Sequence, residues 1–314
     1  MAGFFNALSA CLVLLMLMAV GYFMGVRGWM TAREKAFVSK YIINIAVPCN
    51  CIVGLLDNLD HDDLARAGLQ VLAGMVGVAV TLAISAVAAA LLRLPRARWG
   101  VFVAMAGLSN TLFIGIPVST QLFGDVCMPY VMLYYLANTS FLQSVGILLI
   151  EHAGGHTSRG GGAGRFFRDL FTKPPILAVL LSLALLVLDL QLPGPVMRFA
   201  GYIGDSVSPM ALIYCGFILY EVGLKNLKLM PGLPAMLVIR LVLAPALCWG
   251  CCLLFGVTGL ARDVFVVESA LPVVSQVTVM AGAYGADEEY AATGACLSVF
   301  GCLVTIPILM LILG

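Results

Sequence analysis

YIINIAVP at residues 41–48 and YIGDSVSP at residues 202–209 are two copies of one short element. In both copies a tyrosine is followed by a polar residue three positions later and by a proline seven positions later, at a constant offset of 161 residues (209 − 48). A proline inside a helix lacks a backbone donor and frees groups that lipid cannot satisfy. Two such interruptions in one apolar chain are typical of a transporter, whose binding site forms where helices unwind.

The composition places the chain in a lipid bilayer. Of its 314 residues, 62% are hydrophobic and 11% are charged, whereas a soluble domain is about half apolar and about a quarter charged. Apolar stretches of about 20 residues predict an all-α integral membrane protein and exclude a barrel of short alternating strands. The net charge of +1 gives no indication of a nucleic-acid partner. The ten cysteines lie in or beside apolar stretches and are expected to be reduced.

At about 20 residues per crossing, the apolar pattern predicts ten transmembrane helices. They are expected near 5–26, 36–56, 66–92, 100–123, 127–150, 174–192, 197–222, 231–256, 262–283 and 289–313. The polar stretch 151–173 is a predicted cytoplasmic linker between a first half, 1–150, and a second half, 174–314. Because each half has an odd number of helices, the second enters the membrane from the opposite side. We therefore expect a 5+5 inverted repeat.

Basic residues predict the orientation of the chain. Lys and Arg gather in loops one, three, five and seven, at Arg27, Arg33, Lys35, Arg93, Arg96, Arg98, Arg159, Arg165, Arg168, Lys173, Lys225 and Lys228. The opposite side carries an acidic cluster, DNLDHDD at 57–63. Since positive loops stay in the cytoplasm, we expect a multi-pass protein of the cytoplasmic (inner) membrane with both termini outside.

Two predicted helices carry polar runs near mid-membrane, GLSNTLFIGIPV at 107–118 and ESALPVVSQ at 268–276. Unwound there, the backbone would offer N–H groups to an anion and carbonyls to a cation. Prolines also kink membrane helices without any further role, which is our interpretation of Pro245 and Pro307, where no polar neighbours occur. The predicted substrate-binding residues are Asn44, Ser109, Asn110, Thr111, Pro117, Arg240, Pro272 and Gln276.

Three charged residues inside predicted helices have several interpretations. Arg240 lies about nine residues into helix eight, roughly 13 Å from its start and near the middle of a core about 30 Å thick. It could hold a carboxylate substrate, pair with Glu268 or Asp205, or extend to the cytoplasmic surface. Asp205 and Glu268 are candidate sites for a coupling proton or sodium ion, unless they lie just inside the outer interface.

GLSNTLFIGIP in helix four, the N-x-x-x-P of helix two, and ALP followed by AYGAD in helix nine resemble the auxin efflux carrier family. That family includes bacterial carriers of malonate and other organic acids, and the short linker favours this bacterial type. The resemblance covers nearly the whole chain and implies a fold similar to bile-acid/sodium symporters, with helices four and nine broken and crossing. It implies a scaffold of helices one, two, six and seven, and a transport domain of helices three to five and eight to ten. It also implies a substrate site at Asn110 and around Pro272. Glu268 departs from the pattern, since many bacterial members have a small uncharged residue there.

Together these features predict a secondary carrier of small organic anions, such as malonate, that works by alternating access. A channel, or a receptor that senses the substrate without moving it, is the alternative on the same fold. No nucleophile–base arrangement is seen in the predicted helices, so no enzyme activity is expected. His152 and His156 lack further ligands at a suitable spacing, so no metal or other cofactor is expected. A homodimer in the bilayer is left open.

Overall fold

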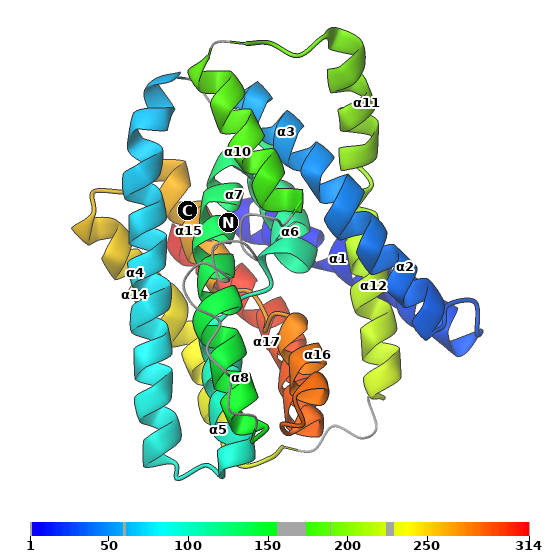
Figure 1. Ribbon diagram of the computed structural model, residues 1–314, viewed down its shortest axis with the longest axis vertical. Coiled ribbons are helices and arrows are strands. Elements are labelled where there is room, and N and C mark those ends of the chain that lie inside the picture. The colour runs from blue at the N-terminus through cyan, green and yellow to red at the C-terminus, as the bar shows by residue number, and fades with distance from the viewer. Residues whose placement is uncertain (1, 59–60, 156–173, 189, 224–228, 314) are drawn as a thin grey trace.

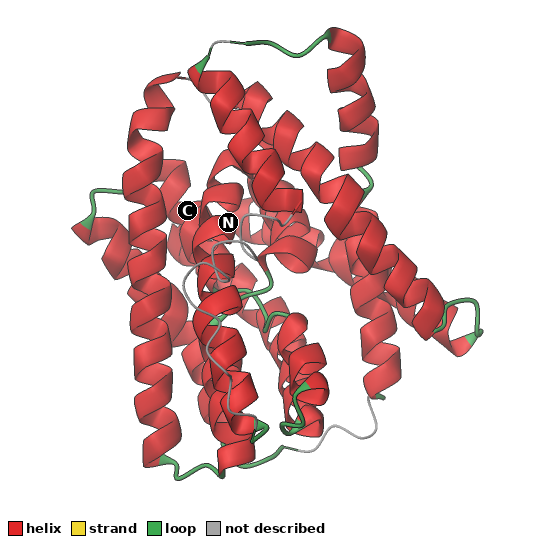
Figure 2. Cartoon of the chain, viewed as in Figure 1, coloured by secondary structure: helices red, strands yellow, loops and turns green. Residues whose placement is uncertain are grey.

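Helices make up all the regular structure in the part of the chain that the computed structural model describes, residues 2–58, 61–155, 174–188, 190–223 and 229–313 (Figures 1 and 2). Within these ranges, the extended backbone is limited to one isolated bridge between Ser109 and Val273. Six helical stretches are long and apolar enough to cross a membrane: Ala32–Asp57, Ala67–Leu91, Asp125–Ala153, Gly194–Glu221, Leu233–Leu254 and Glu288–Leu313. The chain is thus a helical membrane protein, as its composition predicts.

The helical segments follow one another with short connections. Those of the first half are α1 (Ala2–Val26), α2 (Ala32–Tyr41), η1 (Ile42–Ala46), α3 (Val47–Asn58), α4 (His61–Leu91), α5 (Arg96–Gly107), η2 (Thr111–Gly115), α6 (Ile116–Phe123), η3 (Asp125–Cys127), α7 (Met128–Phe141), η4 (Leu142–Gly146) and α8 (Ile147–Ala153). Those of the second half are α10 (Pro174–Val187), α11 (Gly194–Gly204), α12 (Val207–Val222), α13 (Leu233–Val238), η6 (Ile239–Leu243), α14 (Ala244–Leu254), α15 (Gly259–Ser269), α16 (Gln276–Ala283) and α17 (Glu288–Leu313). The segments η1, η2, η4 and η6 are π-helical turns and η3 is a 3-10 turn.

Two of the predicted helices contain a non-helical interior. The range predicted as helix four is α5, then extended residues 108–110, then η2 and α6. The range predicted as helix nine is α15, then non-helical residues 270–275, then α16. Pro272 lies inside the second interruption, because its ring cannot continue the ladder of helical hydrogen bonds. Pro117, by contrast, lies in the first turn of α6, where no intrahelical donor is needed.

The two sequence copies that open the chain's first pattern lie side by side. The Tyr41 hydroxyl and the Ser206 hydroxyl are 2.9 Å apart, and the Asn50 side-chain amide donates to the Gly204 carbonyl at 3.2 Å. The first copy passes through the π-helical turn η1, and the second is interrupted between α11 and α12. Both copies therefore depart from a regular α-helix, and each departure faces the other.

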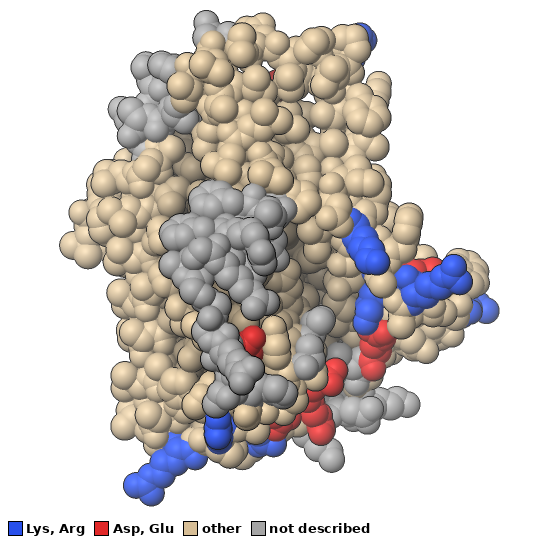
Figure 3. All heavy atoms as spheres, in the orientation of Figure 1, with Lys and Arg blue, Asp and Glu red and all other residues tan. Residues whose placement is uncertain are grey.

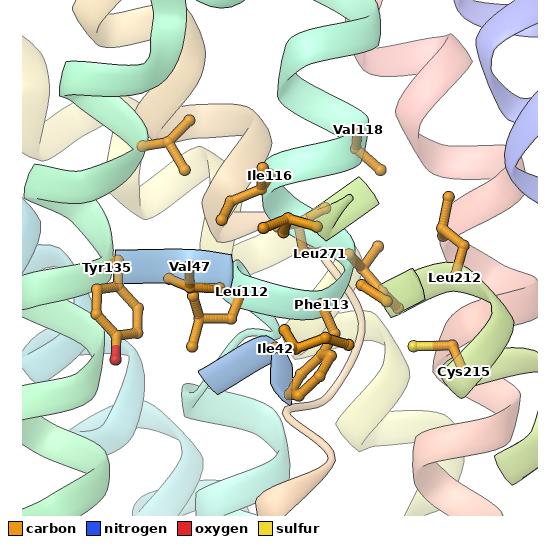
Figure 4. Close-up of a cluster of buried hydrophobic side chains, with 14 of the residues drawn as sticks. Ile42, Val47, Leu112, Phe113, Ile116, Val118, Tyr135, Leu212, Cys215 and Leu271 are labelled. Atoms are coloured by element: carbon orange, nitrogen blue, oxygen red, sulfur yellow. The ribbon is translucent and has the colours of Figure 1, made fainter. Parts of the chain in front are cut away.

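The buried apolar side chains form two clusters. The first, which we call the interface cluster, joins residues of α2, η1, α3, α10 and α12 to residues of η2, α6 and α7. Figure 4 shows Ile42, Phe113 and Leu212 meeting in it from three of these segments. The second, the inner cluster, joins α4, α5, α8, α14, α15 and α17 around Phe102, Phe265 and Tyr290. The broken helices thus contribute side chains to both clusters.

Charged groups are concentrated on part of the surface. Figure 3 shows a broad surface without Lys, Arg, Asp or Glu in the upper part of the view, and charges gathered in its lower half and near α2. Lys35 pairs with Glu221 at 2.5 Å, which links α2 to α12, and Arg98 pairs with Asp287 at 2.6 Å, which links α5 to the start of α17. Most of the polar linker predicted at 151–173 lies outside the described residues.

Candidate functional site

The two interrupted helices cross at their non-helical segments. The Asn110 N–H donates to the Pro272 carbonyl at 2.9 Å, and the Val274 N–H donates to the Leu108 carbonyl at 3.3 Å. These two bonds flank the antiparallel bridge between Ser109 and Val273. Each chain thereby satisfies backbone groups that the other helix break has freed, as an apolar surrounding requires.

Side chains from two further helices cover the outer edges of this bridge. On one edge, Asn138 of α7 accepts from the Ser109 N–H at 3.1 Å and donates to the Ser109 carbonyl at 2.9 Å. On the other edge, Ser298 of α17 accepts from the Val273 N–H at 3.0 Å. Ser109 is fully buried, so its backbone groups depend on Asn138 rather than on water. The crossing is therefore a four-part structure built from α5–η2, α15–α16, α7 and α17.

A cavity of about 100 Å³ lies beside the crossing. Its polar lining comes from both breaks and from α7 and η4, and consists of Asn110, Thr111, Tyr135, Asn138, Thr139, Gln143, Ser275 and Gln276. Its apolar lining includes Ile43, Leu112, Phe113, Leu142 and Val274. Since a site for one water needs about 10–15 Å³, this cavity has room for several waters or a small solute. None of the side chains that line it is charged.

Two helix N-termini open onto this cavity. Thr111 begins η2, which continues into α6, and Gln276 begins α16. The Asn110 side-chain oxygen already accepts from the Phe113 N–H at 3.2 Å, and its amide donates to the Ser275 hydroxyl at 3.1 Å. The first backbone N–H groups of a helix have no partner in their own helix and carry partial positive charge. A negatively charged group in the cavity would be stabilised by both N-termini, although no cationic side chain lines it.

The structure brings together only some of the residues predicted to bind substrate. Asn110, Thr111 and Gln276 line the cavity, and Ser109 and Pro272 form the crossing next to it. Asn44 is exposed, and its amide donates to the Lys40 carbonyl of its own helix at 2.8 Å. Pro117 is buried in α6 and does not line this cavity.

The predicted set did not include Asn138, Thr139, Gln143 and Ser275, which also line the cavity. The signal for three of them is present in the sequence, because Asn138, Thr139 and Gln143 are polar residues in the middle of the predicted helix 127–150. Polar side chains at such a depth usually face the interior of the bundle. Their meeting with the two breaks, however, depends on how α7 packs.

Arg240 lies in the protein interior, away from this cavity. Its side chain is 1% exposed, and one guanidinium nitrogen donates to the Ser269 carbonyl, at the C-terminal end of α15. The described ion pairs do not include Arg240, so it pairs with neither Glu268 nor Asp205. A guanidinium at a helix C-terminus binds free carbonyls and complements the negative end of the helix dipole. This contact holds α15 at the point where it ends and the crossing begins.

Glu268 and Asp205 are in very different surroundings. Glu268 is 0% exposed, and one of its carboxyl oxygens accepts from the Ser119 hydroxyl of α6 at 2.6 Å. Asp205 is exposed at the end of α11 and lines a separate cavity of about 300 Å³ together with Asp57 and Asp125. In the described residues, no group of three His, Cys, Asp or Glu side chains is arranged to hold a metal ion.

Comparison with known proteins agrees with a membrane carrier. The sequence profile of the family described as "Membrane transport protein" matches residues 7–159 and 163–310. The chain is similar to an uncharacterized transporter of Methanothermobacter thermautotrophicus, with 25% identity over 99% of both chains. It is also similar to an uncharacterized transporter of Methanocaldococcus jannaschii, with 22% identity over 96% of this chain and 97% of the relative.

Proposed function

The chain belongs to the membrane transport protein family, and on that premise we propose that it is a secondary carrier of small organic anions. We place it in the cytoplasmic membrane with ten spans arranged as a 5+5 inverted repeat and with both termini outside. In this proposal the predicted helices one, two, six and seven form a scaffold, and the other six move as a transport domain. Movement of one domain against the other would expose the site to each side in turn.

The observation that carries this proposal is the cavity of about 100 Å³ onto which two helix N-termini open at the crossing. Amide groups at Thr111 and Gln276 would bind a carboxylate, and the neutral side chains of Asn110, Gln143 and Ser275 would bind its oxygens. A site without a fixed cation binds an anion moderately and can release it, which a carrier requires. Malonate, a short dicarboxylate, is the probe we choose for this class.

The packing supports a division into two bodies. The interface cluster lies where the proposed scaffold meets the broken helices, whereas the inner cluster lies within the proposed transport domain. The pair of Lys35 with Glu221 joins two scaffold helices, and the pair of Arg98 with Asp287 joins two helices of the transport domain. Across the boundary the contacts include the stacked rings of Phe113 and Tyr214, with centroids 4.9 Å apart. Apolar contacts without fixed ion pairs can be exchanged for similar contacts as the bodies slide.

The test is uptake of radiolabelled malonate into proteoliposomes by the wild-type chain and by Asn110→Ala. We expect saturable uptake that an internal malonate load accelerates, and its loss in Asn110→Ala. Ser182→Ala is the matched control, because Ser182 is buried but bonds only to the Ala178 carbonyl of its own helix α10. Full uptake by Asn110→Ala would refute the placement of the site at the crossing.

Two alternatives give different results in the same assay. A channel would pass malonate without acceleration by an internal load, because a channel does not need to return its site. A sensing receptor would bind malonate without any uptake into the vesicles. If neither binding nor uptake occurs, malonate is not the substrate, and other short carboxylates are the next probes.

A further inference from the structure

Glu268 is a carboxyl group with an incomplete set of partners. One oxygen accepts from the Ser119 hydroxyl at 2.6 Å, while the other, Oε2, is buried and has no hydrogen-bond partner. Gly115 lies directly against it, so that a Cβ atom at Gly115 would be 2.3 Å from Oε2. Counted from the start of α15 at Gly259, Glu268 is roughly 14 Å along the helix, near the middle of a bilayer core about 30 Å thick.

No cation of the described chain neutralises this carboxyl group. The described ion pairs do not include Glu268, and the buried guanidinium of Arg240 donates to the neighbouring Ser269 carbonyl instead. An ionised carboxylate enclosed in an apolar surrounding without a partner charge is very costly, whereas an unmade hydrogen bond costs far less. Glu268 therefore needs a bound proton or a small cation in this conformation.

The surrounding oxygen atoms favour the proton. A sodium ion in an unwound membrane helix is coordinated by several oxygens, chiefly backbone carbonyls. Here the carbonyls of the crossing already accept from protein donors: Leu108 from Val274, Ser109 from Asn138, Ser269 from Arg240 and Pro272 from Asn110. A proton needs only the one free oxygen of Glu268, and Oε2 offers it.

Few other ionisable groups compete for this proton. Helix α15 packs against η3, α6, α7, α14 and α17. The titratable or charged groups that these elements and η6 place around Glu268 and Arg240 are Asp125, Cys127, Tyr134, Cys248 and Cys302, besides Arg240 itself. Of these, Asp125 is exposed and lines the cavity of about 300 Å³, and Glu268 is the only carboxyl group in this set that is fully buried.

We propose that Glu268 is the residue at which the carrier binds its coupling proton. A proton from water on one side converts the carboxylate to the neutral acid, which can be enclosed with α15 and α6. When the transport domain faces the other side, the acid releases this proton to water and becomes a carboxylate again. The transport role rests on the proposed function, but the protonation of Glu268 in the resting protein does not.

The first experiment therefore requires no substrate. Infrared difference spectra of the purified full chain, recorded while the pH is raised stepwise from neutral, should contain the C=O stretching band of a protonated, buried carboxyl group. We expect this band in the wild type and in Glu289→Gln, whose side chain is exposed, and not in Glu268→Gln. In Ser119→Ala the band should persist but shift in frequency, because the 2.6 Å hydrogen bond to Oε1 is lost. The same band in wild type and Glu268→Gln would overturn the proposal.

The second experiment measures coupling with malonate as the probe. An inward proton gradient should stimulate uptake by the wild type and by Glu289→Gln, and the ratio of uptake with and without the gradient should fall to unity in Glu268→Gln. Stimulation by a sodium gradient that is lost in Glu268→Gln would overturn the assignment of a proton. Absence of malonate uptake in the wild type, with the infrared band present, would refute malonate as the substrate and leave the proton site supported.

Discussion

Asn138→Ala is the substitution that most directly tests the construction of the crossing. Asn138 bonds to both the N–H and the carbonyl of Ser109, at 3.1 and 2.9 Å, and Ser109 is fully buried. Leaving one buried polar group unsatisfied costs about 1–3 kcal/mol, so two groups give about 2–6 kcal/mol as an upper range. Because Asn138 lines the cavity, water that enters the space left by the side chain would restore part of this. We expect a local destabilisation of about 1–3 kcal/mol.

Hydrogen–deuterium exchange measures this effect where it occurs. A change of about 1–3 kcal/mol corresponds to roughly 5- to 150-fold faster exchange of amides that open with the crossing. We expect this in peptides that contain residues 108–110 and 272–274, and not in peptides from α1 or α12. Ser140→Ala is the matched control, because Ser140 lies on the same helix and bonds only to the Leu136 carbonyl at 2.7 Å. Equal exchange at the crossing in Asn138→Ala and Ser140→Ala would refute the reasoning.

Two glycine substitutions give further tests, with Gly250→Ala as a shared control, because a Cβ atom at Gly250 has nothing within 4 Å. In Gly115→Ala the new methyl group would lie 2.3 Å from the Glu268 carboxyl oxygen, so the hydrogen bond to Ser119 should be lost and the infrared band of Glu268 should shift. An unshifted band would show that the helices adjust without moving Glu268. In Gly216→Ala the new methyl group would lie 1.8 Å from the Met18 carbonyl, which forces α1 and α12 apart and should destabilise the chain by about 1–3 kcal/mol. The apparent melting temperature in detergent, at one fixed scan rate, should fall by a few degrees relative to Gly250→Ala, and equal temperatures would contradict the close packing of α1 on α12.

Several features of the fold could be predicted from local patterns. Composition and the length of the apolar stretches predicted a helical membrane protein, because the bilayer sets both. Polar residues beside Pro272, and between Gly107 and Pro117, predicted interruptions in two helices, because unpaired backbone groups in lipid need polar partners. The structure has both interruptions, at residues 108–110 and 270–275.

The exact role of a proline was less predictable. Pro272 lies in an unwound segment, whereas Pro117 begins an ordinary helical turn and Pro48 lies in the first turn of α3. A proline at the start of a helix costs no hydrogen bond, so the local sequence does not distinguish a break at the proline from a break several residues before it. The position of the break in α5–η2 is determined by Asn110, whose side chain caps the next turn at Phe113.

The partners of each polar side chain were beyond the reach of the sequence. Asn44, Arg240 and Glu268 look equally suited to a binding site in one dimension, yet the first is exposed, the second binds a helix end, and the third is buried against Gly115. Asn138, which holds the crossing, comes from a helix without a break. Hydrophobicity and backbone satisfaction depend on a residue and its near neighbours, so the chain's membrane class and its two interruptions could be predicted from them. A site is made of contacts between residues more than a hundred positions apart, and only the packing of the helices decides which of those residues meet.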